Sequence, residues 1–103
     1  GLSFIPEPGW GRANRWLSVL LVEPGVFGAD REHLRRALDA AGIESRPAWK
    51  PLHLQPAFRH APQAGGATAA ALFERGLCLP SGSGMGAEDQ ARVIEVVRAC
   101  HGG

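Results

Sequence analysis

The side chains best suited to binding or catalysis lie in one short segment, residues 45–55, whose backbone is stiffened by two prolines. Four of them bring a guanidinium, an indole, an ammonium and an imidazole within eight residues: Arg46, Trp49, Lys50 and His53. A guanidinium can bind a phosphate or carboxylate through two parallel hydrogen bonds, and an ammonium attracts the same groups as a point charge. An indole offers a flat face for stacking, and an imidazole can donate a hydrogen bond near neutral pH. The combination predicts a site for an anionic, ring-bearing ligand. The alternative is a solvated basic loop whose tryptophan only fills the core.

A second string, residues 82–87, has the G-x-G-x-x-A spacing of a dinucleotide-binding turn. Only 16 residues follow Ala87, which is too few for the further strand and the ribose-binding acid about 20 residues on that such a site requires. We interpret this string as the turn into the last helix.

Short apolar runs predict the strands that position these residues. Residues 16–22 are mostly apolar and partly β-branched, and Pro24 with Gly25 ends the run, so we expect a central buried strand there. Residues 77–79 predict a shorter strand, and residues 44–47 are expected to be extended. The density of Pro and Gly in residues 1–14 predicts an entry segment without regular structure.

Three helices are expected, over residues 30–41, 68–75 and 87–100. The first has Asp30 at its N-cap and Gly42 after its last turn, with Ile43 placed to fold back on that turn. Residues 47–66 contain four prolines, which predicts a long, mostly irregular loop with room for one short helical turn. Long loops in compact domains are usually functional.

This order of elements predicts an α+β fold, a small mixed or antiparallel sheet covered by about three helices, in a single domain spanning residues 1–103. The eleven Lys and Arg residues nearly balance ten Asp and Glu residues, so no overall field would recruit nucleic acid or an anionic membrane. Cys78 and Cys100 lack the spacing of a metal or disulfide framework and suit a reducing cytoplasm. No apolar run approaches the roughly 18 residues of a membrane span.

Five strings together resemble the C-terminal region of DegT/DnrJ/EryC1/StrS sugar aminotransferases: residues 14–17, 46–47, 49–51, 53–56 and 76–82. The resemblance implies the C-terminal small domain of a fold-type I, pyridoxal phosphate-dependent enzyme that works as a homodimer. Such an enzyme transfers an amino group from an amino-acid donor to a nucleotide-linked keto sugar, in the biosynthesis of cell-surface glycans. The small domain closes one side of the active-site cleft.

The resemblance also implies roles for individual residues. Arg46 and Lys50 would steady the negative groups of the ligand or the loop that holds them, and Trp49 and His53 would line the sugar and nucleotide path. Gln55 is a further candidate contact. Three residues would approach the same cleft from the first strand: Asn14, Arg15 and Trp16. Ala48 stands where a larger apolar residue is expected, which bears on the shape of the pocket.

The chemistry of transamination needs a lysine that forms a Schiff base, an acid at the pyridinium nitrogen and a phosphate cup. Lys50 is the only lysine in the chain, and it matches the substrate loop of the resemblance. We therefore expect the pyridoxal phosphate and its large domain to lie outside this chain, and the chain alone to be inactive and to bind no cofactor. The alternative function is a stand-alone α+β module that binds a phosphorylated small molecule.

Overall fold

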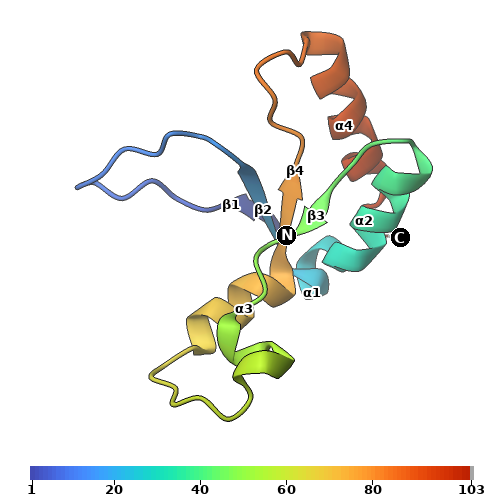
Figure 1. The fold of residues 1–103 in the computed structure, drawn as a ribbon. Coiled ribbons are helices and arrows are strands. Elements are labelled where there is room, and N and C mark those ends of the chain that lie inside the picture. The colour runs from blue at the N-terminus through green and yellow to red at the C-terminus, as the bar shows by residue number, and fades with distance from the viewer. Residues whose placement is uncertain (103) are drawn as a thin grey trace.

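The computed structural model describes residues 1–102, which fold around a four-stranded antiparallel sheet (Figure 1). The strands are β1 (Leu2–Phe4), β2 (Ser18–Val22), β3 (Arg46–Pro47) and β4 (Gly76–Leu79), in the order β1-β2-β4-β3. The two central strands pair with Val19 opposite Cys78 and Leu20 opposite Leu77. The α+β class predicted from the sequence is confirmed, and every strand pair in the described residues is antiparallel.

The helices are α1 (Pro24–Phe27), α2 (Arg31–Ala40), α3 (Ala67–Arg75) and α4 (Ala87–Ala99), with short 3-10 turns at Leu52–Leu54 and Pro56–Phe58. Side chains alternate between the two faces of a strand, so Leu20 and Leu77 share the face that packs against α1, α2 and α4. Leu34 and Leu38 of α2 are fully buried in that core. Figure 1 shows α3 at the end of the sheet, leading directly into β4.

A second, smaller cluster lies on the other face of the sheet. It consists of the buried side chains of Val19, Ala48 and Cys78, with Leu17 and Leu21 packed against it. Cys78 therefore serves as a small buried hydrophobe, and burial raises the pKa of its thiol. This face supports the residues of the candidate site described below.

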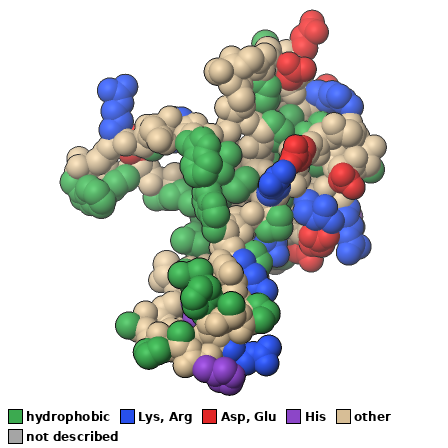
Figure 2. Space-filling view, viewed as in Figure 1, with side chains coloured by type: hydrophobic (Ala, Val, Ile, Leu, Met, Phe, Trp, Pro, Cys, Tyr) green, Lys and Arg blue, Asp and Glu red, His purple; other side chains and the backbone are tan. Residues whose placement is uncertain are grey.

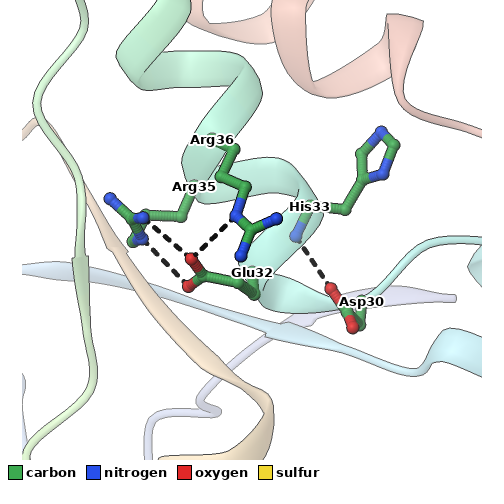
Figure 3. A network of polar contacts seen from close by, with 5 residues as sticks. All are labelled: Asp30, Glu32, His33, Arg35 and Arg36. Carbon is green, nitrogen blue, oxygen red and sulfur yellow. Dashed lines mark hydrogen bonds and ion pairs between the residues drawn. The ribbon is translucent and has the colours of Figure 1, made fainter.

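Both ends of α2 follow the capping predicted from the sequence. The Asp30 carboxylate accepts the His33 backbone N–H at 2.8 Å and satisfies one of the free donors of the first turn (Figure 3). At the other end, Gly42 has φ +71°, a left-handed conformation that glycine adopts without steric cost. The Ile43 N–H then donates to the Leu38 carbonyl at 2.9 Å, which completes a Schellman motif.

The three arginines of α2 make two different kinds of contact. Arg35 and Arg36 both donate to the Glu32 carboxylate, as helical spacing predicts (Figure 3). Arg31 instead turns toward α3, where its Nη1 donates to the Phe73 carbonyl at 2.8 Å. The charge pattern of α2 could not indicate this contact, because Phe73 lies far along the chain.

Three expectations for local structure are corrected. Residues 1–14 were expected to lack regular structure, but β1 forms there because Leu2 and Phe4 pair with Val22 and Leu20. Pro24 ends β2 and also begins α1, since proline is favoured in the first helical turn. The predicted loop over residues 47–66 contains two 3-10 turns rather than one helical turn.

Two segments project from the sheet (Figure 1): residues 5–17, which join β1 to β2 and are called the arm here, and residues 48–66, called the long loop. The radius of gyration is 15.2 Å, whereas about 13 Å is typical of a domain this long. The difference reflects the two projections, and both carry residues of the candidate site.

Candidate functional site

The eight residues predicted to contact a ligand lie on three parts of the fold. Asn14, Arg15 and Trp16 end the arm, Arg46 lies on β3, and the other four lie on the long loop: Trp49, Lys50, His53 and Gln55. The structure brings two of these parts together at the rings of Trp16 and Trp49, whose centroids are 5.9 Å apart at an interplanar angle of 37°. Both indoles remain more than half exposed.

A hollow of about 390 Å³ opens beside this aromatic pair and is called the arm hollow here. Arm residues, the start of β2 and Trp49 line it, so it contains four of the eight predicted residues: Asn14, Arg15, Trp16 and Trp49. Its volume falls within the lower range of small-molecule sites, about 300–1,000 Å³. Apolar walls with a few polar groups are typical of such sites, and here the charged groups are Arg15 and Glu7.

The backbone at Arg15 is held in an unusual conformation. Its φ is +56°, the only positive value at a non-glycine residue among residues 1–102. The Asn14 side chain stabilises this turn because its Oδ1 accepts the Trp16 N–H at 3.1 Å. The Ser81 hydroxyl then donates to the Trp16 carbonyl at 2.8 Å and ties the end of the arm to the segment after β4.

The guanidinium of Arg15 is only loosely engaged by the protein. Its Nη2 lies 3.6 Å from Glu7 Oε2, and its side chain is 70% exposed. The same Glu7 oxygen accepts the Ala13 N–H at 2.7 Å, so Glu7 is held in place by the arm itself. Arg15 therefore keeps N–H groups that can reach a ligand.

Arg46 is placed differently from this group. Its Nε and Nη2 both donate to Glu44 Oε1, at 2.8 and 2.6 Å, in an exposed ion pair. Arg46 lines a larger hollow of about 590 Å³ between the segment after α2, the end of β4 and the start of α4. The structure thus separates Arg46 from the arm hollow.

The charged side chains of the larger hollow have partners within the protein. Arg46 pairs with Glu44, Arg92 donates to the Ala41 carbonyl, and Asp89 accepts the Gly86 N–H at 3.0 Å. Asp89 thereby helps cap α4, which is a structural role. The arm hollow, with its loosely held guanidinium, is the better candidate for a charged ligand.

The remaining predicted residues make contacts inside the long loop. Gln55 Nε2 donates to the Lys50 carbonyl at 3.1 Å and closes the turn between them. The His53 ring lies so close to Gly66 that a Cβ there would come within 2.8 Å of it. These contacts fix the shape of the long loop, while Lys50 itself is exposed.

The chain's own residues do not fit an anchoring site for pyridoxal phosphate. Lys50 lines neither of the two hollows, and the segment around it, residues 47–60, contains no Asp or Glu that could pair with a pyridinium nitrogen. Among residues 1–102, no three His, Cys, Asp or Glu side chains are grouped to hold a metal ion. In the same part of the chain, no helix is long and apolar enough to cross a bilayer.

Sequence reasoning missed several residues of the arm hollow. Glu7 supplies its only acidic side chain, and Phe4 and Ile5 supply apolar wall. The signal was weak because the prolines around Glu7 indicated only an irregular segment. The pairing of β1 with β2 brings these residues back beside Trp16.

Comparison with solved structures indicates the class of protein. The chain superimposes on DesI, solved in the presence of its TDP-sugar product, with a TM-score of 0.82 and 26% identity over 97% of this chain and 26% of that chain. A DegT/DnrJ/EryC1/StrS aminotransferase from Brucella abortus gives a TM-score of 0.78 and 30% identity, over 99% of this chain and 26% of that one. The fold is therefore one found in aminotransferases.

Sequence comparison identifies the family. The model of the DegT/DnrJ/EryC1/StrS aminotransferase family matches residues 2–98, and the chain belongs to that family. It is 43% identical over 101 residues to EpsN of Bacillus subtilis (strain 168), whose name assigns it provisionally to the pyridoxal phosphate-dependent aminotransferases. It is 34% identical over 84 residues to GDP-perosamine synthase of Caulobacter vibrioides. These matches cover 94% and 82% of this chain but only 25% and 22% of the relatives, so it spans about a quarter of their length.

Proposed function

We propose that this chain is the C-terminal small domain of a pyridoxal phosphate-dependent aminotransferase that acts on a nucleotide-linked keto sugar in cell-surface glycan biosynthesis. The single domain supplies one wall of the substrate site and supports a homodimer. An amino acid such as glutamate is the amino donor, and the protein acts in the cytoplasm. The large domain of the same protein carries the cofactor and its lysine.

The arm hollow is the observation that carries this proposal. It places an arginine with open N–H groups beside two exposed indoles, in a chain with almost no net charge to attract anions by itself. A phosphorylated ligand with a ring needs both features, an anion contact and a flat apolar surface. A nucleotide-linked sugar is a ligand of that kind, and the family membership favours it.

Exposed apolar side chains support the presence of further protein around this chain. Trp10 is 91% exposed at the arm, and three residues of the long loop expose much of their surface: Leu52, Leu54 and Phe58. Figure 2 shows apolar side chains gathered over the middle and the lower part of this face, while most of the charged side chains in the same view lie toward its right. Extended apolar surface of this sort marks a contact with other protein. The large domain and a second subunit are the proposed partners.

In this function the chain's residues bind and orient the substrate. The indoles exclude water from the substrate on their side of the cleft, and Arg15 holds a negative group. Gln55 keeps the turn of the long loop closed, so that Trp49 and His53 hold their positions. Pyridoxal phosphate, when bound by the large domain, supplies the electron sink for amino transfer.

The test is transamination by the full-length protein. It is incubated with pyridoxal phosphate, glutamate and a panel of UDP-, TDP- and GDP-linked 3-keto and 4-keto sugars, and the 2-oxoglutarate formed is measured. We expect turnover with at least one keto sugar and none with the isolated 103-residue chain. The isolated chain should also form no borohydride-trappable aldimine at Lys50.

Two outcomes would contradict the proposal. A trapped aldimine at Lys50 would give this chain the catalytic lysine. Binding of phosphorylated small molecules by the isolated chain, without turnover of any keto sugar by the full-length protein, would favour the stand-alone binding module instead.

A further inference from the structure

We propose that the larger hollow, the one of about 590 Å³ that Arg46 lines, is a second binding site, for a neutral ring-bearing molecule with one hydroxyl or amide group. The proposed function makes no use of this hollow, and the proposal does not depend on that function. It rests on three properties of the hollow: its apolar wall, the balanced charges around it, and a buried hydroxyl without a partner.

Most of the wall of the larger hollow is apolar and continuous with the protein core. Ile43 and Val93 line it and belong to the main core cluster, while Cys78 belongs to the cluster on the other face of the sheet. Leu79 and Met85 add further apolar surface. The volume lies within the range of small-molecule sites, about 300–1,000 Å³. A ring placed there would extend the core of the domain.

The charged side chains of the larger hollow do not favour a charged ligand. Two are basic and two are acidic, so their formal charges cancel: Arg46, Arg92, Glu44 and Asp89. Each of the four already makes a hydrogen bond within the protein. A phosphate or a carboxylate would have to displace one of these contacts, and it would lose its hydration on entering an apolar space. The hollow therefore favours a neutral ligand.

Ser45 supplies a hydrogen-bonding group in this apolar wall. Its Oγ is buried and has no hydrogen-bond partner among residues 1–102, although the residue lines the hollow. A buried hydroxyl that lacks a partner is destabilising. Rotation about one bond moves a serine hydroxyl between staggered positions, so a ligand with a hydroxyl or an amide can supply the missing partner.

The larger hollow adjoins the arm hollow but is separate from it. Leu17 lines both hollows. Ser81 lines the larger one, and its hydroxyl donates to the Trp16 carbonyl at the end of the arm. A ligand in the larger hollow would therefore rest against the support of the arm without entering the arm hollow.

The test measures the binding of three probes to the full-length protein by saturation-transfer NMR titration. The probes share one ring and differ in its substituent: toluene, benzyl alcohol and benzoate. We expect toluene and benzyl alcohol to bind. Benzoate should bind at least about tenfold more weakly than toluene, because its charge would lose its hydration in the hollow.

Ser45→Ala tests the hydrogen bond. It should weaken the binding of benzyl alcohol about fivefold and leave that of toluene unchanged, because only the alcohol bonds to the hydroxyl. The variant removes an unpartnered buried oxygen, so it should be as stable as the wild type. Ser83→Ala is the matched control, since Ser83 is exposed and does not line the hollow, and it should change neither affinity.

Met85→Trp tests the position of the ring. Met85 lies on the loop before α4 and is half-buried, so the loop can take up a larger side chain that fills part of the hollow. This variant should weaken both neutral probes by the same factor. Ile94→Trp adds the same ring to the exposed side of α4, outside the hollow, and should leave both affinities unchanged.

Four results would overturn the proposal. They are no binding of either neutral probe, benzoate affinity equal to that of toluene, wild-type affinity for benzyl alcohol in Ser45→Ala, and wild-type affinity for both neutral probes in Met85→Trp. The first would mean that the rest of the protein covers the hollow, and the last that the probes bind elsewhere. Turnover of keto sugars is a separate measurement, so this site and the proposed function can fail independently.

Discussion

Arg31 and Phe73 are joined in two ways, although they belong to different helices. Arg31 Nη1 donates to the Phe73 carbonyl at 2.8 Å, and the guanidinium carbon lies 4.8 Å from the centre of the Phe73 ring. The first contact satisfies a carbonyl within α3, and the second is a cation–π interaction. Together they tie the start of α2 to the helix that leads into β4.

Arg31→Gln should therefore destabilise the chain. Loss of a charge-assisted hydrogen bond and of the cation–π contact predicts a decrease of roughly 1–2 kcal/mol in the free energy of unfolding, measured by urea denaturation. Arg36→Gln is the matched control on the same helix, since its side chain is 75% exposed and pairs only at the surface. Equal effects of the two substitutions would show that the contact with Phe73 contributes nothing.

The Asp30 cap gives a second prediction. Asp30→Ala removes the acceptor of the His33 N–H and should lower the free energy of unfolding by about 1 kcal/mol. Asp30→Ser keeps a capping oxygen and should recover most of the loss. Helical content by circular dichroism and the urea midpoint check both variants, and failure of Ser to restore stability would argue against capping as the cause.

Glu32 predicts a dependence of stability on pH. The hydrogen bonds from Arg35, and then from Arg36, lower the pKa of the Glu32 carboxyl from 4.5 to about 2. A carboxyl whose pKa is lowered by folding stabilises the folded state above its unfolded pKa, and this contribution disappears as the pH falls toward the folded pKa.

Glu32→Gln should thus be less stable than the wild type at neutral pH, and the difference should shrink between about pH 4.5 and pH 2. Because the carboxylate is largely surface-exposed, added salt should also reduce the difference at neutral pH. Thermal melts of both proteins across this pH range provide the measurement. A difference that stays constant with pH would mean that the substitution acts through packing instead.

Gly76 gives a prediction about close packing. A Cβ at this position would lie 2.5 Å from the Leu72 carbonyl oxygen and 2.6 Å from the Ala48 Cβ. Gly76→Ala should therefore push α3 or the Ala48 segment away and cost roughly 1–3 kcal/mol. Gly84→Ala, where a Cβ meets nothing within 4 Å, is the control and should change stability little. The urea midpoints of the two variants distinguish these cases.

Much of the fold could be predicted from local signals. The capping residues at both ends of α2 and the apolar run of β2 are encoded in adjacent residues, and these elements form as expected. β1 could not be predicted, because three residues in a proline-rich segment become a strand only through pairing with β2. The contact of Arg31 with Phe73 was missed for the same reason, since it depends on tertiary packing.

The candidate site was predictable in its residue types but not in its grouping. Arg46 and Trp49 lie in one short segment of the sequence, and we predicted that they contribute to one site. In the structure, Arg46 lines the larger hollow and Trp49 the arm hollow, with Trp16 as its neighbour. Residues close in sequence diverge across a strand, and the contribution of Glu7 arises only from the path of the arm.

Pro47 has a consequence for self-association. On β3 the Ala48 N–H points inward to the Gly76 carbonyl at 2.9 Å, so by alternation the nitrogen of Pro47 faces away from the sheet. The Pro47 nitrogen carries no hydrogen, so it cannot donate a backbone hydrogen bond to a further strand. A chain that paired with β3 would therefore lack one hydrogen bond at this position. This border of the sheet is thereby protected against edge-to-edge aggregation during folding.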